Sequence, residues 1–322
     1  MTATQDSSSG NAGEDRRTRV MRELRVAPGS PAGLAGRDTA WTGGEEFAAL
    51  SADELGATAR ELLERGVRDL RHAQERLWAG SERALLIVFQ AIDAAGKDST
   101  IKHVMSGVNP QGVQVVSFRK PSAEELAHDF LWRISRALPE RGRIGIFNRS
   151  HYEEVIGVRV HPEWLAGQKL PPSESEADLW ASRYEDINAF ERHLDRTGTA
   201  VLKLFLNVSR AEQKRRFMAR LDKPGKQWKF NAADVDERAR WPEYQRAYED
   251  VLTHTSTPWA PWYVIPADRK PVMQAMVAAL VVDRIQAMDL SWPEVSDKAR
   301  AANAEARERL LAEDDDHQPA RT

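Results

Sequence analysis

A short loop, residues 90–98, carries an aspartate, a glycine and a lysine at a spacing suited to phosphate binding. It follows the apolar run 84–89 and precedes a helical pattern. Backbone N–H groups at a helix start carry partial positive charge, and Lys97 adds a full charge, so the loop can hold phosphate. Asp93 would repel phosphate unless a divalent cation lay between them. These residue types predict a phosphate bridged by a metal ion, with Asp93 as the metal ligand.

This loop differs from the usual Walker A phosphate-loop pattern at two positions. Ala91 stands where the first glycine is expected, and Asp98 stands where serine or threonine normally holds Mg²⁺. A Gly-Lys pair also occurs in ordinary strand-to-helix turns, so that alternative stays open on these residues alone. If the loop binds phosphate, we expect its nucleotide- and phosphate-binding residues to include Ala94, Ala95, Gly96, Asp98 and Ser99.

A second group of candidate residues follows the apolar run 144–147. Phosphate-loop enzymes usually have a carboxylate here that holds Mg²⁺ through water, whereas this chain has Asn148. An asparagine can accept a metal-bound water but adds no charge, so Asp93 would carry more of the metal binding. Arg149 could neutralise charge on a transferring phosphoryl group. The alternative for Arg149 is a structural salt bridge to a nearby glutamate such as Glu153, itself a candidate nucleotide-binding residue.

The segment 210–229 is strongly basic, with eight lysines and arginines against two acidic residues, in a chain whose net charge is -3. Such a run is usually a solvated helix face, and that alternative stays open. However, the segment follows the fourth apolar run, where mononucleotide kinases have a lid that closes over phosphates. Eight cations exceed what one nucleoside triphosphate needs, which indicates a longer polyanion. The expected polyanion-binding lid residues are Lys214, Arg215, Arg216, Arg220, Lys223 and Lys229. Arg133 is a candidate nucleotide- or phosphate-binding residue that could extend the same track.

The elements that must position these residues follow from the apolar periodicity. Five apolar runs alternate with helical patterns, which predicts a doubly wound parallel five-stranded sheet flanked by helices. Ligands of such sheets bind at the carboxyl ends of the strands. The expected strands are 84–89, 113–118, 144–147, 200–208 and 262–265, and the expected helices begin near 51, 99, 122, 179, 209, 233 and 272. The patterns predict that the helices beginning at 122 and 233 continue to 138 and 254.

Length and composition favour one main domain. With 322 residues and 41% hydrophobic content, the chain can build a sizeable core. We expect an N-terminal arm at 1–44 that is largely disordered or lies on the surface, a main phosphate-binding domain at 45–290 with a lid at about 210–235, and a charged tail at 291–322. No cysteine and no apolar stretch long enough to span a bilayer are present, so we expect a cytoplasmic protein without membrane partners. The net charge of -3 argues against a protein that coats nucleic acid.

Taken together, the motifs resemble the second family of polyphosphate kinases. The similarity runs in order from Phe47 to Met288 and leaves out only the two tails. Its motifs are Asp93–Asp98, Met105–Gly112, His128–Arg133, Phe147–Glu153, Trp228–Phe230, Thr255–Thr257 and Trp259–Tyr263.

The resemblance implies a P-loop fold of the thymidylate-kinase type with a helical lid. It also implies Mg²⁺-dependent transfer of the terminal phosphoryl group of inorganic polyphosphate to a nucleotide, reversible in principle, with Mn²⁺ as a possible substitute. The catalytic residues it implies are Asp93, Lys97, Asn148 and Arg149. The Asn-Arg-Ser-His-Tyr motif is similar to that of the third class, whose members accept AMP and ADP and so make ADP and ATP. We also expect a homo-oligomer, either a dimer or a tetramer.

Two other functions stay open. An ATP-dependent nucleotide kinase of the same fold would need an adenine pocket for its donor, whereas a polyphosphate donor needs only a basic channel. A polyphosphate-binding protein without catalysis is suggested by Ala91 and Asn148.

Overall fold

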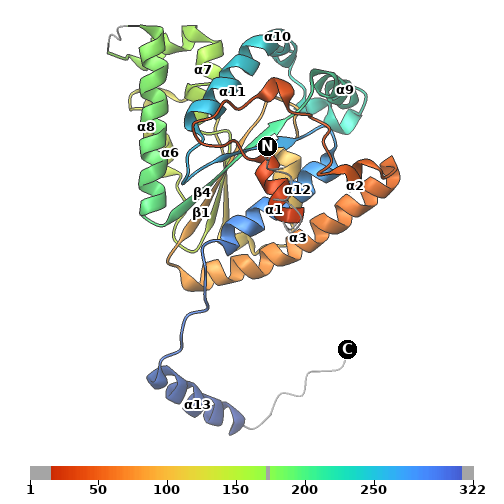
Figure 1. Ribbon diagram of the computed structural model, residues 1–322. Helices are drawn as coiled ribbons and strands as arrows, with labels where there is room; N and C mark the ends of the chain where they lie inside the picture. The colour runs from red at the N-terminus through yellow and green to blue at the C-terminus, as the bar shows by residue number, and fades with distance from the viewer. Residues whose placement is uncertain (1–15, 172–174, 314–322) are drawn as a thin grey trace, which may run out of the picture. The chain divides into compact units, whose positions relative to one another are not determined.

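The computed structural model describes residues 16–171 and 175–313, and the chain divides into two compact units at residues 290 and 291. The first unit is built on a five-stranded sheet in which every neighbouring pair is parallel, in the order β2-β3-β1-β4-β5 (Figure 1). This confirms the predicted doubly wound parallel sheet. The strands are β1 Ala84–Gln90, β2 Val113–Ser117, β3 Ile144–Asn148, β4 Thr199–Asn207 and β5 Trp262–Pro266.

The central strand β1 is buried along its whole length. It pairs with β3 on one side and β4 on the other, and helices cover both faces of the sheet. Its unbroken apolar sequence follows from this environment, because neither face meets water. Burial of each large side chain contributes roughly 1.5–3 kcal/mol, so β1 fixes the base from which the phosphate loop leaves the sheet.

Two helical layers enclose the sheet (Figure 1). One layer contains α3 Ala52–Gly80, α4 Lys97–Val104 and α12 Lys270–Gln286, and the other contains α8 Glu176–Arg196 and α11 Trp241–Thr255. Within the first layer α3 and α12 approach closely at Gly66. A Cβ added to this glycine would lie only 2.9 Å from the Cβ of Ala278. The capping box predicted at the start of α3 is present, with Ser51 and Glu54 exchanging hydrogen bonds.

Two helices predicted as continuous are interrupted. The expected helix 122–138 consists of α5 Ala123–Leu126 and α6 Trp132–Arg136, because the Asp129 carboxylate accepts a hydrogen bond from the Leu131 amide and closes a turn between them. The expected helix 233–254 is divided into α10 Ala233–Ala239 and α11. Pro242 lies in the first turn of α11, where its missing N–H costs nothing, whereas inside one long helix it would clash with the preceding turn.

The N-terminal arm differs from the expectation of a disordered or surface-lying segment in residues 16–44. This stretch contains α1 Arg16–Leu24, and Leu24, Val26 and Leu34 are buried. The Val26 amide donates a hydrogen bond to the carbonyl of Trp262 in β5. The apolar residues between the prolines and glycines of the arm therefore belong to the core. Residues 1–15 lie outside the described part of the chain.

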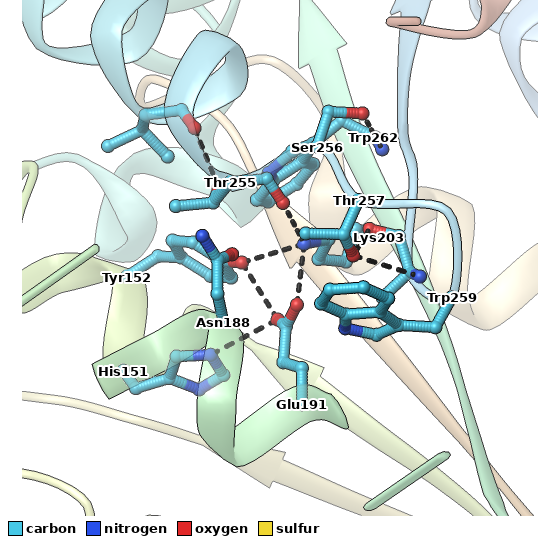
Figure 2. A network of polar contacts seen from close by, with 12 residues as sticks. His151, Tyr152, Asn188, Glu191, Lys203, Thr255, Ser256, Thr257, Trp259 and Trp262 are labelled. Atoms are coloured by element: carbon cyan, nitrogen blue, oxygen red, sulfur yellow. Dashed lines mark hydrogen bonds and ion pairs between the residues drawn. The ribbon is translucent and has the colours of Figure 1, made fainter. Parts of the chain in front are cut away.

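A buried network of polar side chains ties β4 to the helical layer that contains α8 and α11 (Figure 2). The Lys203 ammonium donates to the Glu191 carboxylate at 2.6 Å, to the Tyr152 hydroxyl at 2.9 Å and to the Thr255 carbonyl at 2.6 Å. These three acceptors satisfy all three hydrogens of the ammonium group. Glu191 also accepts a hydrogen bond from Tyr152. The network fixes the short 3-10 helix His151–Glu154 that follows the end of β3.

The remaining elements of the first unit are α2 Glu45–Ala48, α7 Gly157–Val160, α9 Arg210–Leu221 and the 3-10 helices Leu34–Gly36, Pro110–Gly112, Pro162–Gln168 and Pro224–Lys229. The second unit contains α13 Asp297–Leu311, a helix without a distinct apolar face and with no buried residue. Among the described residues, every helix is too short or too polar to span a lipid bilayer.

Candidate phosphate-binding site

The predicted phosphate loop leaves the carboxyl end of β1 beside the end of β3. Phe89 of β1 pairs in register with Asn148 of β3, and the next amide, that of Arg149, donates to the Phe89 carbonyl at 3.0 Å. This pairing carries Arg149 to the loop, where its guanidinium contacts the Asp93 carboxylate at 2.5 Å. The sheet register therefore unites two candidate residues that are 56 positions apart in sequence.

Three backbone positions at this site adopt left-handed conformations. The φ angles are 64° at Ala94, 64° at Arg149 and 114° at Gly96. Residues with a Cβ seldom adopt such angles, and strain of this kind costs about 1–3 kcal/mol and clusters at functional sites. A Cβ at Gly96 would also lie 3.3 Å from the Cε of Met273. The loop thus has a specific, strained shape rather than that of an ordinary strand-to-helix turn.

Lys97 is a buried cation with a second cation, Arg149, close by. Burial, with the repulsion of Arg149 second, lowers its pKa to about 8. Its ammonium donates to the Ala91 carbonyl of its own loop at 2.7 Å. The charges of Asp93, Glu153 and Asp98 offset only part of the burial and the repulsion, so a phosphate would give this group a further negative partner.

Asp93 is held ionised by the cations around it. Burial alone would raise the pKa of Asp93, but Arg149 and Lys97 outweigh it and hold that pKa below its ordinary value. The Glu153 carboxylate contacts the Arg149 guanidinium at 3.3 Å and, opposing the effect of burial, raises the pKa of Arg149 further. Arg149 therefore makes the salt bridge of the structural alternative, and it also lies beside the phosphate loop.

Asn148 and Asp98 form a pair on the other side of the loop. The Asn148 amide donates to the Asp98 carboxylate at 2.7 Å. Asp98 stands at the first turn of α4, where a negative charge interacts favourably with the helix N-terminus. A second carboxylate at position 148 would repel Asp98, so the amide at the end of β3 suits the acidic residue in the loop. Ser99, one residue on, accepts a hydrogen bond from Gln274 of α12.

The residues at the site fit a magnesium ion shared with substrate phosphates. Within the described residues, histidine, aspartate and glutamate form no cluster of three that could hold a metal. Mg²⁺ in phosphoryl-transfer enzymes is commonly bound by one or two carboxylates, with phosphates and waters completing its shell. Asp93, an ionised residue of the loop, meets that requirement, whereas an all-protein metal cage is not present among the described residues.

The predicted lid residues separate into two groups. Lys214, Arg215 and Lys223 are exposed, and Arg220 is partly exposed. By contrast, Arg216 is buried, with 5% of its surface exposed, and its guanidinium donates to the carbonyls of Ala94 and Ala95 in the loop. The side chain of Lys229 lies outside the described part of the structure.

Arg133 lies in a separate environment from the loop. Its guanidinium contacts Glu154 at 3.4 Å and donates to the Arg119 carbonyl at 2.9 Å. It is buried on the short helix α6 and packs over the ring of Phe118, so its contacts join the end of β2 to the turn after β3. These contacts give Arg133 a bracing role between the two segments.

A small cavity at Asp93 and Arg149 is also lined by residues that the sequence patterns did not indicate as site residues. Its lining includes Gln213 from α9, Arg238 from α10, and Tyr244 and Tyr248 from α11. Gln213 donates to the Asp93 carbonyl at 2.9 Å. The two tyrosines are one helical turn apart, so their spacing predicts that they lie on the same face of the helix. Nothing in the sequence shows that this face meets the loop.

The chain is similar to known proteins both in sequence and in structure. Residues 56–293 match the family described as Polyphosphate kinase 2. An ADP-polyphosphate phosphotransferase of Rhodopseudomonas palustris is 48% identical over 252 residues, which cover 78% of this chain and 87% of that protein. An AMP/ADP-polyphosphate phosphotransferase of Meiothermus ruber is 44% identical over 227 residues, which cover 70% of this chain and 81% of that protein. The crystal structure of polyphosphate kinase 2 from Arthrobacter aurescens TC1 superposes with a TM-score of 0.79 at 37% identity, covering 92% of this chain and 99% of that one.

Proposed function

The chain belongs to the polyphosphate kinase 2 family, and from this premise we propose that it transfers the terminal phosphoryl group of inorganic polyphosphate to AMP or ADP. The fold is the P-loop kinase-like fold of that family. The observation that carries the proposal is the joining of Asp93, Lys97 and Arg149 around a strained loop at the end of β1. The choice of acceptor rests on the names of the two relatives.

The reaction needs positioning and charge stabilisation more than covalent chemistry. An oxygen of the acceptor's terminal phosphate attacks the terminal phosphorus of polyphosphate, and the bond from that phosphorus to the bridging oxygen breaks. The shortened chain leaves with the electron pair of that bond. Lys97 and Arg149 would spread the negative charge that develops on the transferred group. No protein nucleophile takes part, which suits a chain without cysteine.

The neighbouring residues of the site also have parts in the proposed reaction. Glu153 orients Arg149, and the amide of Asn148 holds Asp98 at the start of α4. We propose Mg²⁺, replaceable by Mn²⁺, on Asp93, where it would lower the charge repulsion between the two phosphate substrates. Lys97 would exchange its hydrogen bond to the Ala91 carbonyl for one to a phosphate oxygen.

The exposed cations of α9 and the following 3-10 helix support polyphosphate as the donor. Lys214, Arg215 and Lys223 present positive charge to solvent. A polyanion is attracted by a track of such charges whatever its length, whereas a nucleotide donor would also need a base pocket. We therefore assign these three residues, with Arg220, to polyphosphate binding.

The test is incubation of the purified chain with long-chain polyphosphate, Mg²⁺ and either AMP or ADP, with separation of the mono-, di- and triphosphate products. We expect ATP from ADP, and ADP from AMP. Asp93→Asn should abolish product formation, while the exposed helix residue Asp69→Asn serves as the matched control. Turnover with ATP as donor but none with polyphosphate would favour the nucleotide kinase. Polyphosphate binding without turnover would favour the inactive binding protein.

We also propose a cytoplasmic enzyme that assembles as a dimer or a tetramer and does not bind nucleic acid. Light scattering of the purified protein tests the assembly, because one chain has a mass of 36.3 kDa. A single species at that mass across the working concentration range would contradict the proposed oligomer.

A further inference from the structure

The backbone of the phosphate loop is tied to helix α9. Three consecutive carbonyls of the loop accept hydrogen bonds from two α9 side chains. Gln213 donates to the Asp93 carbonyl at 2.9 Å, and Arg216 donates to the Ala94 carbonyl at 3.1 Å and to the Ala95 carbonyl at 2.5 Å. These two donors lie three residues apart, so they share one face of the helix.

Both donors are themselves held in place. Arg238 of α10 donates to the Gln213 side-chain oxygen at 2.7 Å, which leaves the Gln213 amide nitrogen directed at the loop. Arg216 donates to Glu212 at 2.6 Å and to the Ala267 carbonyl, just after β5, at 2.5 Å. Only 1% of Gln213 and 5% of Arg216 is exposed. These side chains are parts of the scaffold rather than free arms of a lid.

The geometry of the peptide bond gives these contacts a consequence for phosphate binding. In a planar trans peptide the C=O and N–H bonds point in opposite directions. Fixing the carbonyls of residues 93, 94 and 95 toward α9 therefore turns the N–H groups of Ala94, Ala95 and Gly96 away from α9. The Ala95 N–H donates to the Ile92 carbonyl at 3.3 Å and braces the turn, so the N–H groups of Ala94 and Gly96 are the ones directed at an anion. Backbone N–H groups of this kind form the concave anion site of phosphate loops. The positive φ angles of Ala94 and Gly96 are the local conformation that this orientation requires.

We propose that Arg216 and Gln213 are positioning residues that aim the loop amides at the transferred phosphoryl group, and that Arg216 does not bind polyphosphate. This inference rests on the proposed function, and it corrects the expectation from the sequence, in which the basic pattern assigns Arg216 to the polyanion. Its neighbour Arg215 has a side chain that is 70% exposed and shares Glu212 as partner. One helix thus carries a charge for the donor on its outer face and a brace for the loop on its inner face.

The experiment compares Arg216→Lys and Gln213→Met with Arg215→Met in the full chain. A lysine keeps the charge of Arg216, but one ammonium cannot reproduce the guanidinium fork that reaches two loop carbonyls and Glu212 at once. We expect Arg216→Lys and Gln213→Met to lower kcat by about 10- to 100-fold, the effect of a misplacement on the order of 1 Å, with the KM for polyphosphate little changed. Arg215→Met should do the reverse, raising the KM for polyphosphate with kcat kept. Arg71→Met, on the exposed surface of α3, is the control for loss of a surface arginine.

A wild-type kcat in Arg216→Lys, or a raised polyphosphate KM with an unchanged kcat in that variant, would overturn the proposal. Hydrogen exchange separates this result from failure of the proposed function, because it needs no substrate. Amides of residues 91–98 should exchange faster in Arg216→Lys and Gln213→Met than in the wild type, and at the wild-type rate in Arg215→Met. Unchanged exchange in both inner-face variants would refute the positioning role even if the chain proved to have another activity. Gln213→Met is neutral and similar in size to the original residue, so it decides the matter should the arginine variant fail to fold.

Discussion

Replacing Lys97 by methionine should stop catalysis and yet make the folded chain more stable. Burial lowers the pKa of Lys97 from the ordinary 10.5 to about 8. At about 1.4 kcal/mol per pKa unit, keeping this lysine charged costs about 3 kcal/mol at pH 7. Methionine removes the charge at similar length but also loses the hydrogen bond to the Ala91 carbonyl, worth about 1 kcal/mol. The expected net gain in the free energy of unfolding is therefore about 2 kcal/mol at pH 7.

The gain should shrink as the pH rises. The pKa of Lys97 is lower in the folded chain than in the unfolded chain. Between pH 8 and 10.5 the unfolded chain therefore binds a proton that the folded chain has released, and the wild type becomes more stable with increasing pH relative to the variant. The charge cost falls from about 3 kcal/mol at pH 7 to about 2 at pH 9 and about 1 at pH 10. At pH 10 the hydrogen bond offsets the remainder, so variant and wild type should be about equally stable.

Urea unfolding of both proteins at pH 7, 9 and 10, followed by circular dichroism, measures these differences. Lys102→Met on the exposed side of the same helix is the matched control, and we expect it to change stability by at most about 0.5 kcal/mol. A Lys97→Met variant that is less stable than the wild type at pH 7, or whose advantage is the same at pH 7 and pH 10, would refute the reasoning. Either result would mean that the loop already satisfies the lysine charge without phosphate.

Three further outcomes follow from the contacts described above. Lys203→Met should destabilise the fold by about 3–5 kcal/mol in urea unfolding, because it leaves Glu191 charged and buried. The double variant Lys203→Met/Glu191→Leu should recover most of that loss. A double variant as unstable as the single one would contradict this explanation. Gly96→Ala should lower both stability, by about 1–3 kcal/mol, and kcat, because alanine is strained at a φ of 114°; unchanged steady-state kinetics would show that the loop tolerates another shape. Raising the salt concentration should increase the KM for polyphosphate more than that for ADP, since Lys214 and Arg215 are exposed; equal increases would place the donor elsewhere.

The sequence alone predicted the parallel sheet because its signals are local. An apolar run such as 84–89 between turn residues indicates a buried strand whatever surrounds it, and the Ser51 and Glu54 capping box marks a helix start in the same way. The loop residues Asp93 and Lys97 could be found for a similar reason, since their roles depend on their place between one strand and the next helix. The interruptions at Asp129 and Pro242 were missed although their causes are local, because the apolar periodicity of each segment continues across the break.

Which cations of the basic segment 210–229 are buried against the loop and which are exposed could not be predicted. Arg215 and Arg216 are adjacent and chemically identical, and the sequence gives no reason to assign them differently. Successive residues of a helix point about 100° apart, so which arginine meets the loop depends on how α9 is rotated against β1 and β5. The meeting of Arg149 with Asp93 likewise required the register of β3 on β1. Local pattern determined which residues are candidates for phosphate binding, and tertiary packing decided which of them lie against the loop and which lie exposed on the helix surface, because only packing fixes the direction of a side chain.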